Sequence, residues 1–258
     1  MNFCGKCGQS LDPVPPVFPG YANRSPREYT PPFLLEKILV SRAALEGERK
    51  HVSVFFADVV GFATLSENLD PEDVHDIMDG CFEILGQEIH GAGGAINQYT
   101  GDGVMALFGA PVVYEDNIHR ACHAALRVQD RMKDYTRDVK KRYGVLFQLR
   151  IGMNAGTVVV GAIGDNLRLD YTAVGDATNL AARLESLANP GGIWVSSAIK
   201  KAAEDFFRFH EEGDYDIKGK KSPITVFSLQ GETDKMPRHG TGMADALFVN
   251  RQSESSLF

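Results

Sequence analysis

The sequence predicts an α+β fold in which helices pack against a sheet. Residues 51–58 form a nearly continuous apolar run, which is typical of a strand at the centre of a sheet. Residues 95–108 read as two strands joined by a tight, glycine-containing turn. Two longer segments, 70–92 and 115–141, carry apolar residues at helical spacing. Strands and helices that alternate in this way predict a mixed architecture.

The helix after the first strand has clear start and stop signals. Asp70 can cap its amino end, and Pro71 suits its first turn. Two consecutive glycines at 93–94 end it. Its apolar positions follow three-four spacing: Val74, Ile77, Met78, Cys81, Ile84 and Leu85. We expect this face to pack against the sheet.

The next elements complete a recognisable unit. Strands at 95–99 and 104–108 form a hairpin around residues 100–103, the long helix 115–141 follows, and residues 145–154 predict another strand. The resulting order, β-α-β-β-α-β, is that of a ferredoxin-like unit.

Additional elements follow this ferredoxin-like βαββαβ core. We expect paired strands at 157–163 and 169–174 around a turn at 164–166, and then a helix at 176–187. Two late strands end near residues 227–229. The prediction is therefore an α+β core with additional strands and helices.

The main domain is expected to span residues 48–230. Residues 11–32 hold most of the 12 prolines and predict an extended linker. Residues 33–47 predict a short amphipathic helix that leads into the domain. The polar segment 231–258 predicts a poorly ordered tail.

Residues 1–10 resemble one knuckle of a zinc ribbon. Cys4 and Cys7 stand in the sequence CGKCG, whose tight turn lets both thiolates face one metal ion. A tetrahedral Zn²⁺ site needs four ligands, and no second cysteine pair follows. Two interpretations remain open: two chains pool their pairs around a shared Zn²⁺, or the module is vestigial or truncated.

Composition excludes several classes of protein. The net charge of −7 comes with scattered Lys and Arg residues, so nucleic-acid binding is not expected. No apolar run approaches the roughly 18 residues of a membrane span, and no secretory leader is recognisable, which predicts a cytoplasmic location. Cys81 and Cys122 lie in apolar helical patterns and predict buried side chains, without a disulfide framework.

Two acidic residues are expected at one edge of the sheet. In the predicted unit, the end of the first strand lies beside the start of the third, which brings Asp58 close to Asp102 of the hairpin turn. Taken singly, each has a structural explanation, as a helix cap or a turn residue. Together, two close carboxylates repel unless they are protonated or bridged by cations. Hard oxygen ligands of this kind suit Mg²⁺ or Mn²⁺.

Two further segments predict contacts to an anionic ligand. After Asp58 the chain passes through Gly61, Phe62 and Ala63 into a short helix, where backbone N–H groups can face a triphosphate. Asn179 and Arg183 are four residues apart on one helix and share a face, which could hold a sugar oxygen and a phosphorus centre or could simply be solvated.

Three segments together resemble the class III adenylate and guanylate cyclase family. They read FFADVVGF at 55–62, GDGVMALFG at 101–109 and DYTAVGDATNLAAR at 170–183. The similarity covers about residues 48–230 in the right order. It implies the class III nucleotide cyclase fold and a catalytic domain over that range. The amino-terminal knuckle is similar to that of a bacterial subset in which this domain precedes an ATPase regulatory region.

The resemblance implies a role for each matching residue. Two Mg²⁺ or Mn²⁺ ions would be held by Asp58, Asp102 and the backbone carbonyl of Val59. The family's transition-state asparagine and arginine fall on Asn179 and Arg183, and its triphosphate-binding lysine falls on Lys218, a residue that could otherwise be part of a charged turn. Because one chain carries both half-sites, the resemblance implies a homodimer with composite sites that converts ATP, or less favourably GTP, into a 3′,5′-cyclic nucleotide.

The purine-reading pair departs from the family pattern. Gln98 occupies the first position and Thr172 the second. Glutamine both donates and accepts hydrogen bonds and so could read either purine, whereas Thr172 favours ATP. Two alternatives stay open: a catalytically weak or inactive nucleotide-binding regulatory module, and a polymerase-like nucleotidyl transferase. The paired Asn179 and Arg183 and the lack of a basic channel count against the second.

Overall fold

The computed structural model describes residues 48–160, 176–217, 219 and 222–233. The segments predicted at 1–47, most of the paired strands at 157–174, and residues 234–258 lie outside this part. The elements in chain order are β1 (Glu48–Val59), α3 (Phe62–Asn68), α4 (Pro71–Gly91), β2 (Ala95–Tyr99), β3 (Gly103–Phe108), α5 (Asn117–Tyr143), β4 (Leu149–Val160), α6 (Asp176–Leu187), β5 (Ile193–Ser196), α7 (Ser197–Ala203), β6 (Phe207–Tyr215) and β7 (Ile224–Glu232).

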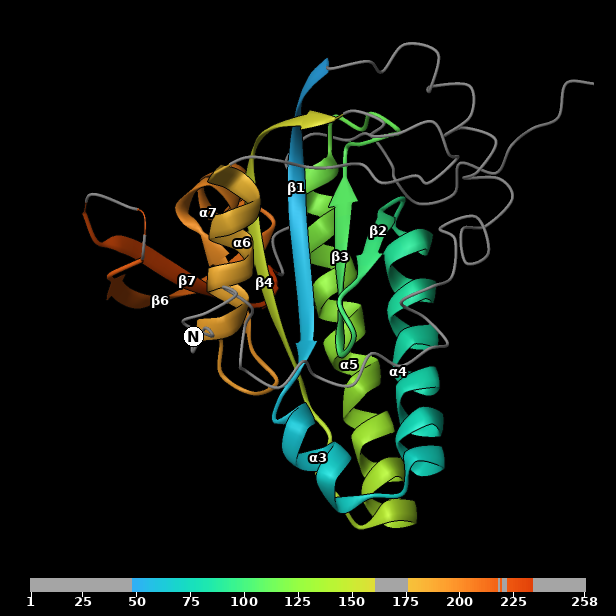
Figure 1. The fold of residues 1–258 in the computed structure, drawn as a ribbon. Coiled ribbons are helices and arrows are strands. Elements are labelled where there is room, and N and C mark those ends of the chain that lie inside the picture. Colours follow the sequence, from blue (N-terminus) through green and yellow to red (C-terminus); the bar gives the residue numbers. More distant parts are fainter. Residues whose placement is uncertain (1–47, 161–175, 218, 220–221, 234–258) are drawn as a thin grey trace, which may run out of the picture.

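The strands form one sheet in the order β2-β3-β1-β4-β5-β7-β6. β1 is antiparallel to both of its neighbours, β3 and β4, and β2 is antiparallel to β3. The first four strands in this order, with α4 and α5, are the ferredoxin-like βαββαβ unit. The predicted α+β fold is therefore confirmed, and β5, β7 and β6 extend the sheet beyond β4 (Figure 1).

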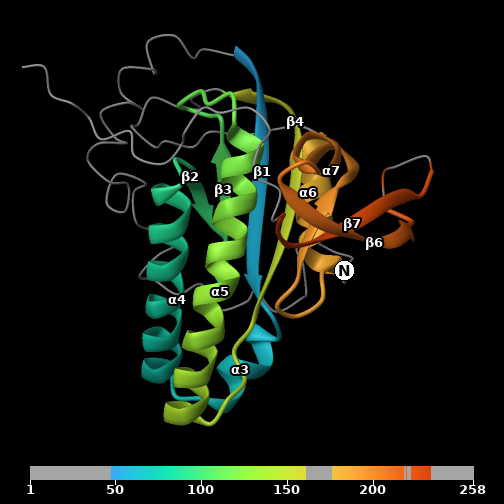
Figure 2. The same cartoon turned by 180° about the vertical axis from the view of Figure 1, so that it is seen from behind.

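Helices lie on both faces of the sheet. α4 and α5 run side by side over one face, as the views from opposite sides show (Figures 1 and 2). The main core lies beneath them, and α7 contributes Ile199 and Ala203 to the same core. Cys81 and Cys122 are buried there as free thiols, as predicted. α6 packs on the opposite face, against β4 and β1.

β4 corrects one prediction. Strands were expected at 145–154 and from 157 onwards, but one continuous strand runs from Leu149 to Val160 and pairs with β1 along its whole length. Gly156, which lies between the two expected strands, pairs with Val52 inside the ladder. A side chain at Gly156 would press against Ala177 of α6. The glycine therefore makes room for a helix and does not turn the chain.

The last part of the domain also differs from the prediction. Two late strands were expected, whereas the structure has three, β5, β6 and β7, with the short helix α7 between β5 and β6. β5 has only four residues, IWVS, all of them buried. A strand this short carries too little alternation to be distinguished from a loop.

α6 lies unusually close to β4. A Cβ atom at Gly152 would collide with the backbone of Ala181 and Glu185 on the helix. Glycine at this position therefore lets the helix backbone rest directly on the strand. Asn154 fixes the same contact, because its side-chain amide donates to the carbonyl oxygen of Ala177 at 3.0 Å.

Candidate active site

Asp58 and Asp102 meet at one edge of the sheet. Asp58, near the end of β1, pairs with Gly103 at the start of β3, and the backbone N–H of Val59 donates to the carbonyl oxygen of Asp102 at 3.2 Å. A Cβ atom at Gly103 would collide with the carbonyl oxygen of Ala57. The register of two strands and an obligatory glycine thus position both carboxyl groups.

The negative charge of Asp58 disfavours a second negative charge on Asp102. Burial raises the pKa of Asp102 to about 6, and the negative charge of Asp58 and a hydrogen bond with its side chain add to the rise, although a backbone hydrogen bond and Arg150 oppose it. Near neutral pH the edge therefore holds carboxylates that are short of compensating positive charge. Mg²⁺ is commonly held by one or two carboxylates together with water and phosphate oxygens, so these residues fit a divalent cation.

Arg150 and Glu185 adjoin this pair, and sequence reasoning missed both. Arg150 of β4 lies opposite Asp58 in the ladder, and its Nη2 is 3.2 Å from Asp58 Oδ2. Its Nε is 2.6 Å from Glu185 Oε1 of α6, and its Nη1 donates to the carbonyl oxygen of Ser186 at 3.1 Å. Burial and the charge of Asp58 raise the pKa of Glu185 to about 7, against the opposing effect of Arg150.

The chain leaves β1 through a left-handed glycine. Gly61 has φ 69° and ψ 28° and precedes α3, as the sequence indicated. Gly61 and Ala63 are exposed, whereas Phe62 is buried in the helix-side core. This turn therefore presents backbone next to the carboxylate edge and anchors it with one aromatic ring.

Asn179 and Arg183 lie apart from the aspartates. Both are exposed on the face of α6 that points away from the sheet, while Ala177 and Ala181 are buried on the opposite face. In the part of the chain that the structure describes, neither side chain hydrogen-bonds or forms an ion pair with Asp58 or Asp102. One chain alone therefore does not bring the two predicted half-sites together.

Gln98 shares a face with Asp58. In the ladder, Gln98 of β2 pairs with Met105, which pairs with Phe56, two residues before Asp58. Gln98 is exposed and follows a bulge in β2 at Asn97. The other predicted site residues, Thr172, Lys218, Cys4 and Cys7, lie outside the described residues.

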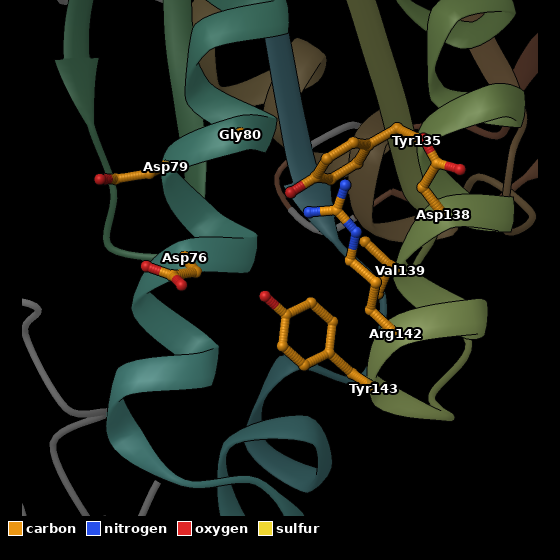
Figure 3. Close-up of a pocket in the computed structure, with 8 residues that line it drawn as sticks. All are labelled: Asp76, Asp79, Gly80, Tyr135, Asp138, Val139, Arg142 and Tyr143. Atoms are coloured by element: carbon orange, nitrogen blue, oxygen red, sulfur yellow. The ribbon is translucent and has the colours of Figure 1, made fainter.

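A hollow lies between α4 and α5. It has a volume of about 320 Å³ and is lined by Asp76, Asp79, Gly80, Tyr135, Asp138, Val139, Arg142 and Tyr143. Arg142 and Tyr143 reach from α5 into the space between the helices (Figure 3). None of the site residues predicted from the sequence lines it.

A family model for the adenylate and guanylate cyclase catalytic domain matches residues 46–231, which is most of the chain. The chain belongs to this family. It therefore contains a nucleotide cyclase catalytic domain, as the three motifs indicated. The same range contains both half-sites described above, from Asp58 to Arg183.

Two curated relatives of the chain are adenylate cyclases. Adenylate cyclase 1 of Rhizobium meliloti is 31% identical over 71% of the chain, and an adenylate cyclase of Anabaena cylindrica is 28% identical over 70%. The chain spans 28% and 37% of the length of these two cyclases.

Solved cyclase structures have the same fold. The adenylyl cyclase CyaB from P. aeruginosa matches with a TM-score of 0.70 and 28% identity over 75% of the chain and 100% of its own. The guanylyl cyclase Cya2 matches with a TM-score of 0.68 and 33% identity over 74% of the chain and 96% of its own. None of the helices within the described ranges is long and apolar enough to cross a bilayer.

Proposed function

We propose that this cyclase domain converts ATP into 3′,5′-cyclic AMP and pyrophosphate in a homodimer with two Mg²⁺ or Mn²⁺ ions at each site. The observation that carries the proposal is the pair of carboxyl groups of Asp58 and Asp102 at one sheet edge, where burial and mutual repulsion raise the pKa of Asp102. Binding a divalent cation relieves this repulsion.

Asp58, Asp102 and the backbone carbonyl of Val59 would hold the cations. When bound, two such ions activate the ribose 3′-hydroxyl and neutralise charge on the leaving pyrophosphate. The 3′-oxygen attacks the α-phosphorus, the bond from the α-phosphorus to the oxygen that bridges the α- and β-phosphates breaks, that oxygen leaves with pyrophosphate, and the hydroxyl proton passes to solvent. The chain itself orients the nucleotide and supplies the remaining positive charge.

Four residues would hold the triphosphate. Gly61, Phe62 and Ala63 form the turn beside the aspartates, and Lys218 would add a cation. Asn179 and Arg183 would come from the second chain of a homodimer, because in their own chain both point away from the sheet. There Asn179 would fix the ribose, and Arg183 would stabilise the transferring phosphoryl group.

ATP is proposed as the substrate in preference to GTP. Thr172 matches the residue that adenylate cyclases use, and Gln98 lies exposed on the same sheet face as Asp58. An amide can donate to or accept from either purine, so Gln98 would orient the base without strict selection.

A product assay tests the proposal. Purified protein is incubated with ATP or GTP, each with Mg²⁺ or Mn²⁺, and cyclic nucleotide and pyrophosphate are measured. Cyclic AMP as the main product supports the proposal, and cyclic GTP as the main product reverses the substrate assignment. Tight nucleotide binding without pyrophosphate release would favour the alternative of a nucleotide-binding regulatory module.

Mixing two inactive variants tests the composite site. Asp58→Ala removes a cation ligand, and Arg183→Ala removes a group that we assign to the opposite half-site. A heterodimer of the two would contain one intact site, so activity should return after the chains exchange. No recovery after exchange has been verified, for example by differential labelling, would show that the sites are not shared.

A further inference from the structure

Glu185 occupies an unusual position for a charged residue. It lies on the sheet-facing side of α6, four residues after Ala181 and eight after Ala177, both of which are buried. Its side chain is only 10% exposed. The close approach of α6 to β4 at Gly152 places it beside Arg150, two residues earlier on that strand. A carboxylate buried this deeply needs a specific partner.

The guanidinium of Arg150 contacts both α6 and Asp58. Two of its nitrogens contact α6: Nε forms an ion pair with Glu185 Oε1 at 2.6 Å, and Nη1 donates a hydrogen bond to the carbonyl oxygen of Ser186 at 3.1 Å. Only Nη2 reaches Asp58, at the longer distance of 3.2 Å. The arginine therefore has two contacts with the helix, an ion pair and a hydrogen bond, and one hydrogen bond with Asp58.

A divalent cation at Asp58 would compete with this contact. The guanidinium and the metal ion are both positive and would share one carboxylate, so the arginine must loosen its hold on Asp58 as the cation binds. Glu185 and the Ser186 carbonyl would retain the arginine and leave it paired. Without Glu185, a partly buried guanidinium would have Asp58 as its nearest negative charge and would hold it more tightly.

We infer that Glu185 is a positioning residue that holds Arg150 so that a divalent cation can take Asp58. The inference rests on the proposed function, because it requires a cation at the aspartate edge. Glu185 acts through Arg150 and does not itself bind the metal ion. It is thus an outer partner that tunes the affinity of the carboxylate pair.

The test measures Mn²⁺ binding in the absence of nucleotide, by electron paramagnetic resonance of the free ion. Glu185→Gln keeps the shape of the side chain and removes its charge, so the Kd for Mn²⁺ should rise by about tenfold, as for outer partners of metal ligands. Adding Arg150→Gln to this variant removes the competing cation and should bring the Kd back towards the original value. Glu88→Gln, which breaks an Arg131–Glu88 pair of 2.8 Å between α4 and α5, is the matched control and should leave the Kd unchanged.

The outcomes separate this inference from the proposed function. Asp58→Asn should abolish the Mn²⁺ site, and undiminished binding in that variant would overturn the proposed function. If Asp58→Asn loses binding while Glu185→Gln lowers only the melting temperature, Glu185 is merely structural and the inference fails. Should Glu185→Gln not fold, Arg150→Gln alone decides: a tighter Mn²⁺ Kd supports the competition, and an unchanged or weaker one contradicts it.

Discussion

The protein carries two groups of acidic side chains that differ in burial. At the sheet edge, the side chain of Asp58 is 22% exposed and that of Glu185 only 10% exposed, and both form ion pairs with Arg150. Asp76 and Asp138, which line the hollow between α4 and α5 (Figure 3), are exposed to solvent. The two groups have similar compositions, with several carboxylates and one arginine each.

The difference teaches that the number of acidic residues does not define a cation site. Water screens the exposed carboxylates of the helix hollow, so they gain little from a bound cation. At the sheet edge, burial and neighbouring charge raise the pKa of Asp102 to about 6 and that of Glu185 to about 7. The carboxyl groups at the sheet edge therefore repel one another, and a bound cation can relieve this repulsion.

The largest expected effect is on cyclase turnover, and it distinguishes the acidic residues of the sheet edge from those of the helix hollow. Asp58→Ala should lower cyclase turnover by about 10³-fold, or about 4 kcal/mol of barrier, because a proposed cation ligand is lost. Asp138→Asn in the helix hollow, measured in parallel under Mn²⁺, should change turnover by less than about twofold, since its carboxylate is solvated. Near-normal turnover of Asp58→Ala would remove the distinction between the two groups.

The next effect concerns the glycine that lets the aspartates meet. Gly103→Ala would drive a methyl group into the carbonyl oxygen of Ala57, and the strand backbones must separate. We expect a loss of about 2–3 kcal/mol of unfolding free energy in urea titrations, as in other overpacked sites, together with reduced activity. An unchanged urea midpoint would mean that the two strands are not as tightly apposed as described.

Without metal, Asp102→Asn should stabilise the folded state slightly, whereas Gly103→Ala should destabilise it. The pKa of Asp102 is higher in the folded state than the ordinary value, so its contribution favours folding at low pH and is lost as the pH rises through about 6. At about pH 7.5, removing the charge should raise the melting temperature by about 2–4 °C, the shift that about 1 kcal/mol gives in a domain of this size.

The pH dependence is the control for that variant. The gain of Asp102→Asn should vanish below about pH 4, where the carboxyl group is protonated in the folded and unfolded states alike. With Mn²⁺ added the order of the two melting temperatures should reverse, because the variant lacks a proposed cation ligand. A gain that is independent of pH would point to packing rather than charge.

The smallest effect is expected at the glycine of the helix hollow. Gly80→Ala would collide with the hydroxyl and ring of Tyr135, whose hydroxyl donates to the carbonyl oxygen of Ile77 at 2.7 Å. Loss of that hydrogen bond costs about 1 kcal/mol, which the higher helix propensity of alanine offsets. Gly86→Ala on the same helix, where a Cβ atom meets nothing within 4 Å, should instead stabilise by about 0.5–1 kcal/mol. Equal midpoints for the two variants in urea would show that Tyr135 adapts freely.

Much of the fold could be predicted because strong local signals agree with it. The apolar run of β1, the glycine-containing hairpin after Tyr99 and the two long amphipathic helices leave few alternatives to a ferredoxin-like unit. The meeting of Asp58 with the hairpin follows from that topology alone. The roles of the site residues stay predictions, which the experiments above address.

Arg150 and Glu185 escaped prediction for a physical reason. Arg150 stands within a strand and Glu185 within a helix, and each alone looks like an ordinary surface residue. Their contact depends on how closely α6 packs on β4, which is a tertiary property set by Gly152. One signal was present: Glu185 continues the four-residue spacing of Ala177 and Ala181, and a charge in such an apolar stripe indicates a buried partner.

Gly152 also determines how accurately α6 is located. No side chain lies between the strand and the helix at this point, so the sheet serves as a reference plane for the helix. A methyl group added at this position would push the whole helix away from the sheet. Asn179 and Arg183, on the far side of the helix, would move with it. A displacement of about 1 Å can lower the rate of a reaction about 10²-fold. A substitution at Gly152 in one chain would therefore slow the reaction at the site that this chain shares with the second chain of the proposed dimer.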